Sequence, residues 1–567
     1  MLTAMDKTRL LANIVRWRLT WSRRDTRYRP ADLDSHKFIS AREAAQKIKD
    51  ASVVFSCGMA GHARCSIFYW AIRECFEETG HPKGLTWINV GAQGGRGRVP
   101  GTIEELGFPG LITRYIVGHA ETAKAQLKLA EEGQLELHTM GQAEMAFLVE
   151  GQAEGKTDLE TTVGVGTFLD PRVGSGSAVS PNARENFIEP AGDKLRYRLP
   201  KIDVGIFSAP YADREGNIYF KHAATLTENE LAAKAAKANG GLSLAAVGGI
   251  VEKNEAEIGI PAKYIDYVVF NSRNEQTGSV PQRRYWPMFT VGANVDVAKA
   301  VAELKYINST LKITPLRGPV ENALARLAAS LFASEARPGA TVNIGVGLPE
   351  EVCRLVYESG LYKDLIFTSE TGVYGGLPAP GIFFGGAINP VRMENSAWMF
   401  RLYLEKLDVA VLGLLEADSE GNVNVSKRGP KLTDYVGPGG FPAIVAGAKT
   451  IIFVGSWMAH AKMNLKDGRL AIDEPGTPKF VDKASQITFS GKEGLRQGKR
   501  VYYVTNVGVF KLTPRGLELW KAMPGVDIQR DILQTATAKI VLPANGRVET
   551  VEDSIATGEN FRLSWPE

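Results

Sequence analysis

The sequence has few of the residues that build disulfide frameworks or metal sites. Four of its 567 residues are cysteine and seven are histidine. Cys57, Cys65 and Cys75 are spaced too widely for paired zinc ligands, and Cys353 stands alone. No His-Glu-x-x-His motif occurs. We therefore expect no metal and reduced thiols, which are typical of a cytoplasmic protein.

Long apolar runs and a strong net charge are also lacking. No run approaches the roughly 20 apolar residues that span a bilayer, and the net charge is +4 over the whole chain. We expect neither nucleic acid nor a membrane as a partner. A chain of this length exceeds one ordinary hydrophobic core and implies at least two domains.

Residues 1–36 form a basic N-terminal extension. Its arginines are Arg9, Arg16, Arg18, Arg23, Arg24, Arg27 and Arg29. It has no apolar core of the kind found in secretory signals, and four aspartates argue against an organelle presequence. These are Asp6, Asp25, Asp32 and Asp34. We expect an extension that lies on the folded body or contacts a partner subunit, and that carries no chemistry.

Short apolar strands alternate with helices along the rest of the chain. Ser40 and Glu43 form a capping box for a helix that should end near residue 50. Strands are expected at 53–55, 87–90, 163–165, 204–207, 267–270, 341–344, 365–367, 409–412, 451–454 and 501–504, with helices at 121–132 and 320–334. This alternation predicts an α/β fold with mostly parallel sheets. The turn-rich stretch 274–294 precedes a boundary, which gives domains at 37–305 and 314–567.

The two halves share a detailed motif. Asp203 precedes the turn Asp213–Asn217, and Asp408 precedes the turn Asp418–Asn422. Ten residues separate the two aspartates in each half, and both turns read Asp-x-Glu-Gly-Asn. Asx and glycine turns arise by chance, but this in-register match favours duplication. We predict two related domains fused in one chain, with the active site in the cleft between them.

A glycine loop follows the first strand of each half. The loops are Ser56–Ala63 and Ile344–Glu350. A strand, glycine turn and helix together expose backbone amides that suit an anion. Neither loop matches Gly-x-Gly-x-x-Gly, so no dinucleotide fingerprint is present. Tight strand–helix turns explain both loops equally well.

Glu370 stands directly after the apolar run 365–367, before a glycine-rich turn. In open α/β sheets, ligands bind just beyond the carboxyl ends of strands. Glu-Thr-Gly after a strand is usually a surface turn. Glu370 is therefore a candidate functional residue only in combination with motifs elsewhere in the chain.

Five stretches, taken in order, resemble the fused two-domain family I CoA-transferases of the acetate, propionate and acetoacetate type. They are Thr162–Arg172, Val342–Pro349, Gly421–Lys427, Ile487–Lys492 and Pro524–Leu533. The similarity extends from about residue 37 to the C-terminus. The resemblance implies acyl-CoA and a carboxylic acid as substrates, with CoA as a substrate and no permanently bound cofactor. A homo-oligomer is the default expectation.

The resemblance also implies roles for individual residues. Glu370 is the nucleophile, and its ordinary pKa of about 4.3 leaves it ionised at neutral pH. Gln142 and the amide of Gly440 face the oxyanion, although a helix-start glutamine and a plain glycine turn are the alternatives. The glycines expected at the CoA surface are Gly345, Gly347, Gly372, Gly375, Gly376 and Gly439. Of these, Gly372, Gly375 and Gly376 would let the CoA thiol approach Glu370.

The sequence departs from the family pattern around the substrate surfaces. Ala63-Arg64 stands where Pro-Glu is usual, and Gly141 and Ala143 stand where Pro and Gly are usual. Tyr374 replaces a smaller aliphatic residue, and Tyr403–Lys406 replaces a glycine-rich segment. Aromatic residues could line a larger acyl pocket or pack in the core; these are Phe383, Phe384, Trp398 and Phe400. Two alternatives to a transferase stay open: an acyl-CoA hydrolase on the same scaffold, and a non-catalytic CoA-binding module.

Overall fold

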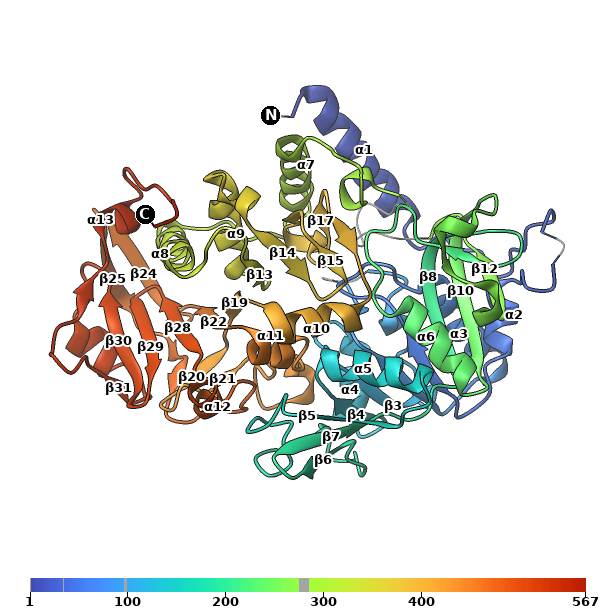
Figure 1. Cartoon of the computed structure of the whole chain (residues 1–567), viewed down its shortest axis with the longest axis horizontal. Helices are drawn as coiled ribbons and strands as arrows, with labels where there is room; N and C mark the ends of the chain where they lie inside the picture. The colour runs from blue at the N-terminus through green and yellow to red at the C-terminus, as the bar shows by residue number, and fades with distance from the viewer. Residues whose placement is uncertain (1, 34, 96–98, 275–284, 567) are drawn as a thin grey trace.

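A computed structural model describes residues 2–33, 35–95, 99–274 and 285–566. Two large sheets dominate it, one built from each half of the chain (Figure 1). Within the described residues, no helix combines the length and apolar character that crossing a bilayer demands.

The first sheet has a parallel centre flanked by helices on its faces. Its central strands run in the spatial order β4, β3, β2, β1, β8, β10, β12. Their bounds are Glu136–Thr139, Ile112–Val117, Leu85–Asn89, Val53–Ser56, Val204–Ala212, Leu242–Ile250 and Tyr267–Phe270. The helices α2, α3, α4, α5 and α6 span Ala41–Gln46, Ser66–Thr79, Lys124–Glu131, Gln142–Ala153 and Asn229–Ala238.

The second sheet repeats this arrangement and adds an antiparallel extension. Parallel strands run in the order β14, β13, β19, β22, β28, and antiparallel β29 and β30 follow. Their bounds are Ile366–Ser369, Thr341–Ile344, Val409–Gly413, Thr450–Val454, Arg500–Thr505, Gly508–Thr513 and Gly516–Ala522. The helices α8, α9, α10 and α11 span Pro319–Glu335, Pro349–Glu358, Ser396–Lys406 and Phe441–Gly447.

Equivalent hydrogen bonds confirm that the two sheets are related. Asp203 precedes β8, and its Oδ2 accepts a bond from the amide of Val53 in β1 at 2.8 Å. Asp408 precedes β19, and its Oδ2 accepts a bond from the amide of Thr341 in β13 at 3.0 Å. Each aspartate therefore fixes the start of the neighbouring parallel strand. The domain limits 37–305 and 314–567 remain a prediction.

One predicted strand is wrong. Residues 163–165 form a turn, and the strand β5 lies earlier, at Asp158–Thr161. Gly164 has φ +89°, and a Cβ on it would lie 2.4 Å from the hydroxyl of Tyr197. Alternating Val and Gly thus marks a tight turn here. In the expected turn-rich stretch, residues 275–284 lie outside the described residues.

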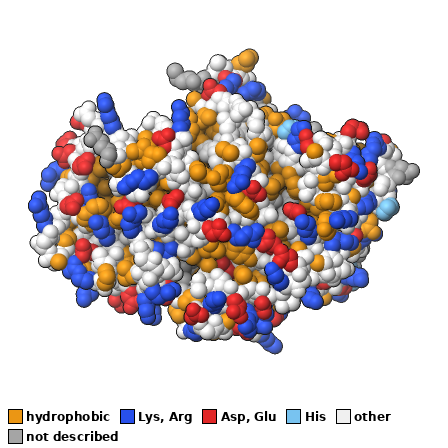
Figure 2. Space-filling view, viewed as in Figure 1, with side chains coloured by type: hydrophobic (Ala, Val, Ile, Leu, Met, Phe, Trp, Pro, Cys, Tyr) orange, Lys and Arg blue, Asp and Glu red, His pale blue; other side chains and the backbone are white. Residues whose placement is uncertain are grey.

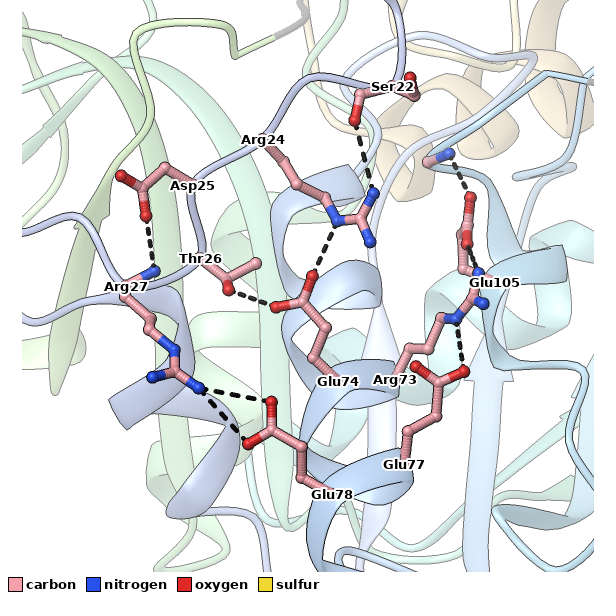
Figure 3. Close-up of polar contacts among 11 residues, drawn as sticks. Ser22, Arg24, Asp25, Thr26, Arg27, Arg73, Glu74, Glu77, Glu78 and Glu105 are labelled. Carbon is pink, nitrogen blue, oxygen red and sulfur yellow. Dashed lines mark hydrogen bonds and ion pairs between the residues drawn. The ribbon is translucent and has the colours of Figure 1, made fainter.

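The N-terminal extension lies on the folded body, as predicted. Its helix α1 (Ala4–Thr20) packs on α7 (Val297–Thr310), and Arg9 forms an ion pair with Glu303 at 2.7 Å. Beyond α1, Arg24 pairs with Glu74 of α3 at 2.8 Å, and Thr26 bonds the same carboxylate (Figure 3). Charged contacts therefore hold the extension along the first half.

Candidate active site

A cavity of about 1290 Å³ is lined by residues from both halves of the chain. From the first half it receives the loops that follow β1, β2 and β3, together with the start of α5. From the second half it receives the loops that follow β13, β14 and β19. The carboxyl ends of both parallel sheets thus meet at one cavity, which is where ligands bind in open α/β sheets.

Glu370 lies in this cavity, one residue beyond the end of β14. The side-chain amide of Asn343, on the adjacent strand β13, donates to Glu370 Oε2 at 3.5 Å and to Tyr403 Oη at 3.2 Å. Burial raises the pKa of Glu370, while the bond from Asn343 opposes this effect. The carboxylate is therefore less acidic than the ordinary value assumed from the sequence.

Gln142 and Gly440 come together from different halves. Gln142 is the first residue of α5 and is 5% exposed, and its backbone N–H donates to the carbonyl of Gly439 at 3.0 Å. Gly440 precedes α11, and a Cβ on it would lie 3.2 Å from Gln142 Oε1. Both residues line the same cavity as Glu370. Gln142 is thus not an exposed helix-start residue.

Three of the six predicted CoA-surface glycines line the cavity. They are Gly345, Gly347 and Gly439. No heavy atom lies within 4 Å of a Cβ built on Gly347 or Gly439. These two backbones are therefore open to a ligand.

The glycines after Glu370 do not line the large cavity and have a different structural reason. Gly372, Gly375 and Gly376 all have positive φ, between +73° and +101°. A Cβ on Gly372 would lie 1.8 Å from the carbonyl oxygen of Glu394, and one on Gly376 would lie 2.6 Å from that of Ile388. The glycines allow the turn to pack closely on residues 388–394. Their role in CoA approach remains a prediction.

Of the four aromatic residues considered for an acyl pocket, Phe384 lines the cavity. Phe383 and Phe400 are fully buried, and Trp398 packs edge-on against Tyr374. A second, small chamber of about 20 Å³ lies beside the nucleophile candidate. Glu370 and Phe384 line both spaces. Because Phe383 and Phe400 are fully buried, core packing accounts for both.

The structure also brings in residues that sequence reasoning missed. Asn343 lies inside the matched stretch Val342–Pro349 but has no pattern of its own that marks a role. Basic side chains line the cavity as well: Lys124, Arg317 and Arg428. Arg428 pairs with Glu121 at 2.5 Å, and Arg317 pairs with Glu351 at 3.0 Å. The three basic residues come from distant segments of the chain, so no local motif could identify them.

Acidic, cysteine and histidine side chains do not gather into a metal-binding group within the ranges that the structure describes. The four cysteines are free and buried.

Comparison with known proteins gives a clear relationship, although no family model matches the chain. Caffeate CoA-transferase of Acetobacterium woodii is 34% identical over 510 residues, covering 88% of this chain and 93% of that protein. Acetate CoA-transferase YdiF of Escherichia coli K12 is 30% identical over 510 residues, covering 87% and 91%.

A solved structure agrees with these relatives. The apoenzyme of the acyl-CoA transferase YdiF from Escherichia coli O157:H7 is 27% identical, with a TM-score of 0.80, covering 93% of this chain and 98% of that one. A YdiF structure described as a thioester complex with CoA matches with the same TM-score. The chain belongs to the fused two-domain CoA-transferases. It is an enzyme that transfers CoA between an acyl-CoA and a carboxylate.

Proposed function

We propose that Glu370 is the nucleophile of a ping-pong CoA transfer. A carboxylate oxygen of Glu370 attacks the thioester carbonyl, and the carbon–sulfur bond breaks to give an acyl-glutamyl anhydride and CoA thiolate. The thiolate attacks the glutamyl carbonyl, which releases the first carboxylate and leaves a glutamyl-CoA thioester. An acceptor carboxylate reverses these steps and leaves as the new acyl-CoA.

The observation that carries this proposal is the meeting of three residues at one cavity. Glu370 directly follows a strand of the second sheet, while Gln142 begins a helix of the first, next to Gly440. Each step develops negative charge on a carbonyl oxygen, and fixed donors at that point stabilise it. The side-chain amide of Gln142 and the backbone N–H of Gly440 are the donors that we assign. The YdiF–CoA thioester complex supports the covalent route.

The thioester bond energy passes from one acid to the next, so the transfer needs no ATP. Water must therefore be kept from the glutamyl intermediates. A hydrolase on the same scaffold is the alternative in which water replaces the acceptor carboxylate. Acyl-CoA and a free carboxylic acid are the substrates that we assign.

The cellular setting that we propose is a cytoplasmic homo-oligomer. Four buried, free thiols suit a reducing compartment. Most soluble oligomers are closed homo-oligomers, which makes this the default assembly.

Mass spectrometry of the covalent intermediate tests the proposed function. After incubation with acetyl-CoA, we expect a CoA-sized adduct on the peptide that carries Glu370, and none in Glu370→Gln. Glu121→Gln is the matched control, because Glu121 is a cavity carboxylate that does not follow β14. It should keep the adduct.

The fate of the adduct separates the alternatives. An adduct that only a carboxylate acceptor discharges supports the transferase. One that decays in buffer alone indicates a hydrolase, and the lack of any adduct in the wild type indicates a non-catalytic CoA-binding module.

A further inference from the structure

Helix α1 has a second apolar face that the protein body does not cover. Its inner face buries Leu10, Ile14 and Trp17. On the outer face, Met5 is 80%, Leu11 44%, Val15 49% and Leu19 73% exposed. Leu11, Val15 and Leu19 recur every four residues, so they form one ridge on the helix surface. We call Met5, Leu11, Val15 and Leu19 together the outer stripe.

Cations border the outer stripe on both sides. At about 100° per residue, Lys7 and Arg18 lie along one edge and Arg16 along the other, and all three are exposed. Among the described residues, no ion pair involves any of them; Arg18 stacks on the ring of Trp21. Figure 1 places α1 along the outer edge of the molecule, and Figure 2 shows hydrophobic and basic side chains together there.

The net charge of the protein is concentrated in this extension. Residues 1–36 contain eight Lys and Arg against four Asp, a net charge of +4. The whole chain also carries +4, so residues 37–567 have equal numbers of acidic and basic side chains. The small total, from which we expected no membrane partner, therefore hides a cationic extension. Helix α1 itself carries a net charge of +3, from Lys7, Arg9, Arg16 and Arg18 against Asp6.

We propose that the outer stripe of α1 binds reversibly to an anionic phospholipid surface. An exposed apolar stripe with cations along both edges matches a helix that lies in the plane of a bilayer interface. The apolar side chains enter the headgroup boundary, and the long basic side chains extend to lipid phosphates. The cytoplasmic leaflet carries negative charge, which fits the proposed compartment.

Charge argues against a second copy of α1 as the occupant. In an antiparallel helix pair about a two-fold axis, each edge faces the same edge of its partner. Lys7 and Arg18 would then face the partner's Lys7 and the partner's Arg18. Like charges at such an edge are unfavourable, whereas lipid phosphates neutralise them.

Co-sedimentation of the full chain with vesicles tests this proposal, which does not depend on the assignment of Glu370. We expect binding to phosphatidylcholine vesicles that contain phosphatidylserine, weakening as salt is added, and little binding to phosphatidylcholine alone. Lys7→Gln/Arg16→Gln/Arg18→Gln should lower the partition coefficient by about 10²-fold, since each cation contributes about fivefold. Leu11→Gln/Val15→Gln/Leu19→Gln should lower it by at least about tenfold.

Two controls keep the outcome clear. Val173→Gln/Leu316→Gln changes exposed apolar residues elsewhere, 53% and 101% exposed, and should bind vesicles like the wild type. CoA-transferase activity should be unchanged in every α1 variant, because α1 does not line the cavity. Wild-type protein that fails to bind anionic vesicles at low salt overturns the proposal. So does a Leu11→Gln/Val15→Gln/Leu19→Gln variant that binds normally, or one that changes only the oligomeric state in light scattering.

Discussion

The side-chain amide of Asn343 donates to Glu370 Oε2 at 3.5 Å, from the neighbouring strand of the second sheet. Asn343 pairs in register with Thr368, two residues before Glu370. The same amide donates to Tyr403 Oη at 3.2 Å, so α10 also contributes to its orientation. A donor to the ionised carboxylate lowers its pKa, and burial raises it.

Removal of this donor should move the pH dependence of the enzyme. In Asn343→Ala the ionised form of Glu370 loses its hydrogen bond, so the pKa rises further. Because the carboxylate is the attacking form, the acidic limb of kcat/KM moves to higher pH while the plateau above it persists. The measurement is kcat/KM against pH with one acyl-CoA. Tyr403→Phe keeps the Asn343–Glu370 contact and should move the limb less. A limb that stays in place, or moves to lower pH, contradicts this role for Asn343.

Gln142→Ala should lower kcat by about 10²-fold or more, the usual loss for one oxyanion donor. Gln152 lies on the same helix but bonds the carbonyl of Pro200 at 2.9 Å, away from the cavity. Gln152→Ala should therefore affect stability and leave turnover near the wild-type value. If Gln142→Ala turns over normally, Gln142 does not act at the oxyanion.

Alanine substitutions at the adjacent glycines Gly440 and Gly439 should have different kinetic effects, the first on catalysis and the second on CoA binding. Gly440 has φ −78°, which alanine adopts, but the added Cβ would lie 3.2 Å from Gln142 Oε1. Gly440→Ala should therefore lower kcat by displacing Gln142. Gly439 has φ +59°, a left-handed backbone that alanine adopts with modest strain, and its Cβ would project into open space at the cavity. Gly439→Ala should raise KM for acyl-CoA with kcat largely retained. Steady-state kinetics of both variants decide this, and identical effects would contradict the assignment.

The sequence predicted most of the central parallel strands because they are short apolar runs, but it missed β3, β4 and β10. The strands at 267–270 and 341–344 match the structure residue for residue. Strand β4 was missed because it reads Glu-Leu-His-Thr, with His138 and Thr139 buried in spite of their polarity. Polar residues at the end of a buried strand give no apolar run to detect.

The candidate site was predictable only in part. Glu370 and Gln142 could be placed by resemblance, and the structure puts both in one cavity. Asn343 and Tyr403 are 60 residues apart, and only strand pairing and helix packing bring them together. The glycine-rich turn at Gly372 was visible in the sequence, but its positive φ and its close approach to Glu394 depend on a chain segment that folds back.

The duplicated turns should stabilise both halves in the same way. Asp213 Oδ1 accepts a hydrogen bond from the backbone N–H of Asn217 at 3.0 Å. Asp418 Oδ1 accepts one from the backbone N–H of Asn422 at 2.9 Å. Asp213→Ala and Asp418→Ala should each lower the midpoint of urea unfolding, since each buried group left unpaired costs about 1–3 kcal/mol. Asp193→Ala, at an exposed turn where φ is negative, should leave the midpoint unchanged. An unchanged midpoint in either turn variant would contradict the equivalence.

Phe384 should limit the size of the acyl group. It lines both the small chamber and the large cavity, and so does Glu370. Phe384→Ala removes an aromatic ring that lines both spaces, so a bulkier acyl group gains room next to the nucleophile. We expect the ratio of kcat/KM for an aromatic acyl-CoA over acetyl-CoA to rise by about tenfold or more, as pocket contacts of this size allow. Phe383→Leu is the matched control, because Phe383 is buried against Trp286 and Phe289. It should lower stability and leave the ratio unchanged. A ratio that stays constant in Phe384→Ala would place the acyl group elsewhere in the cavity.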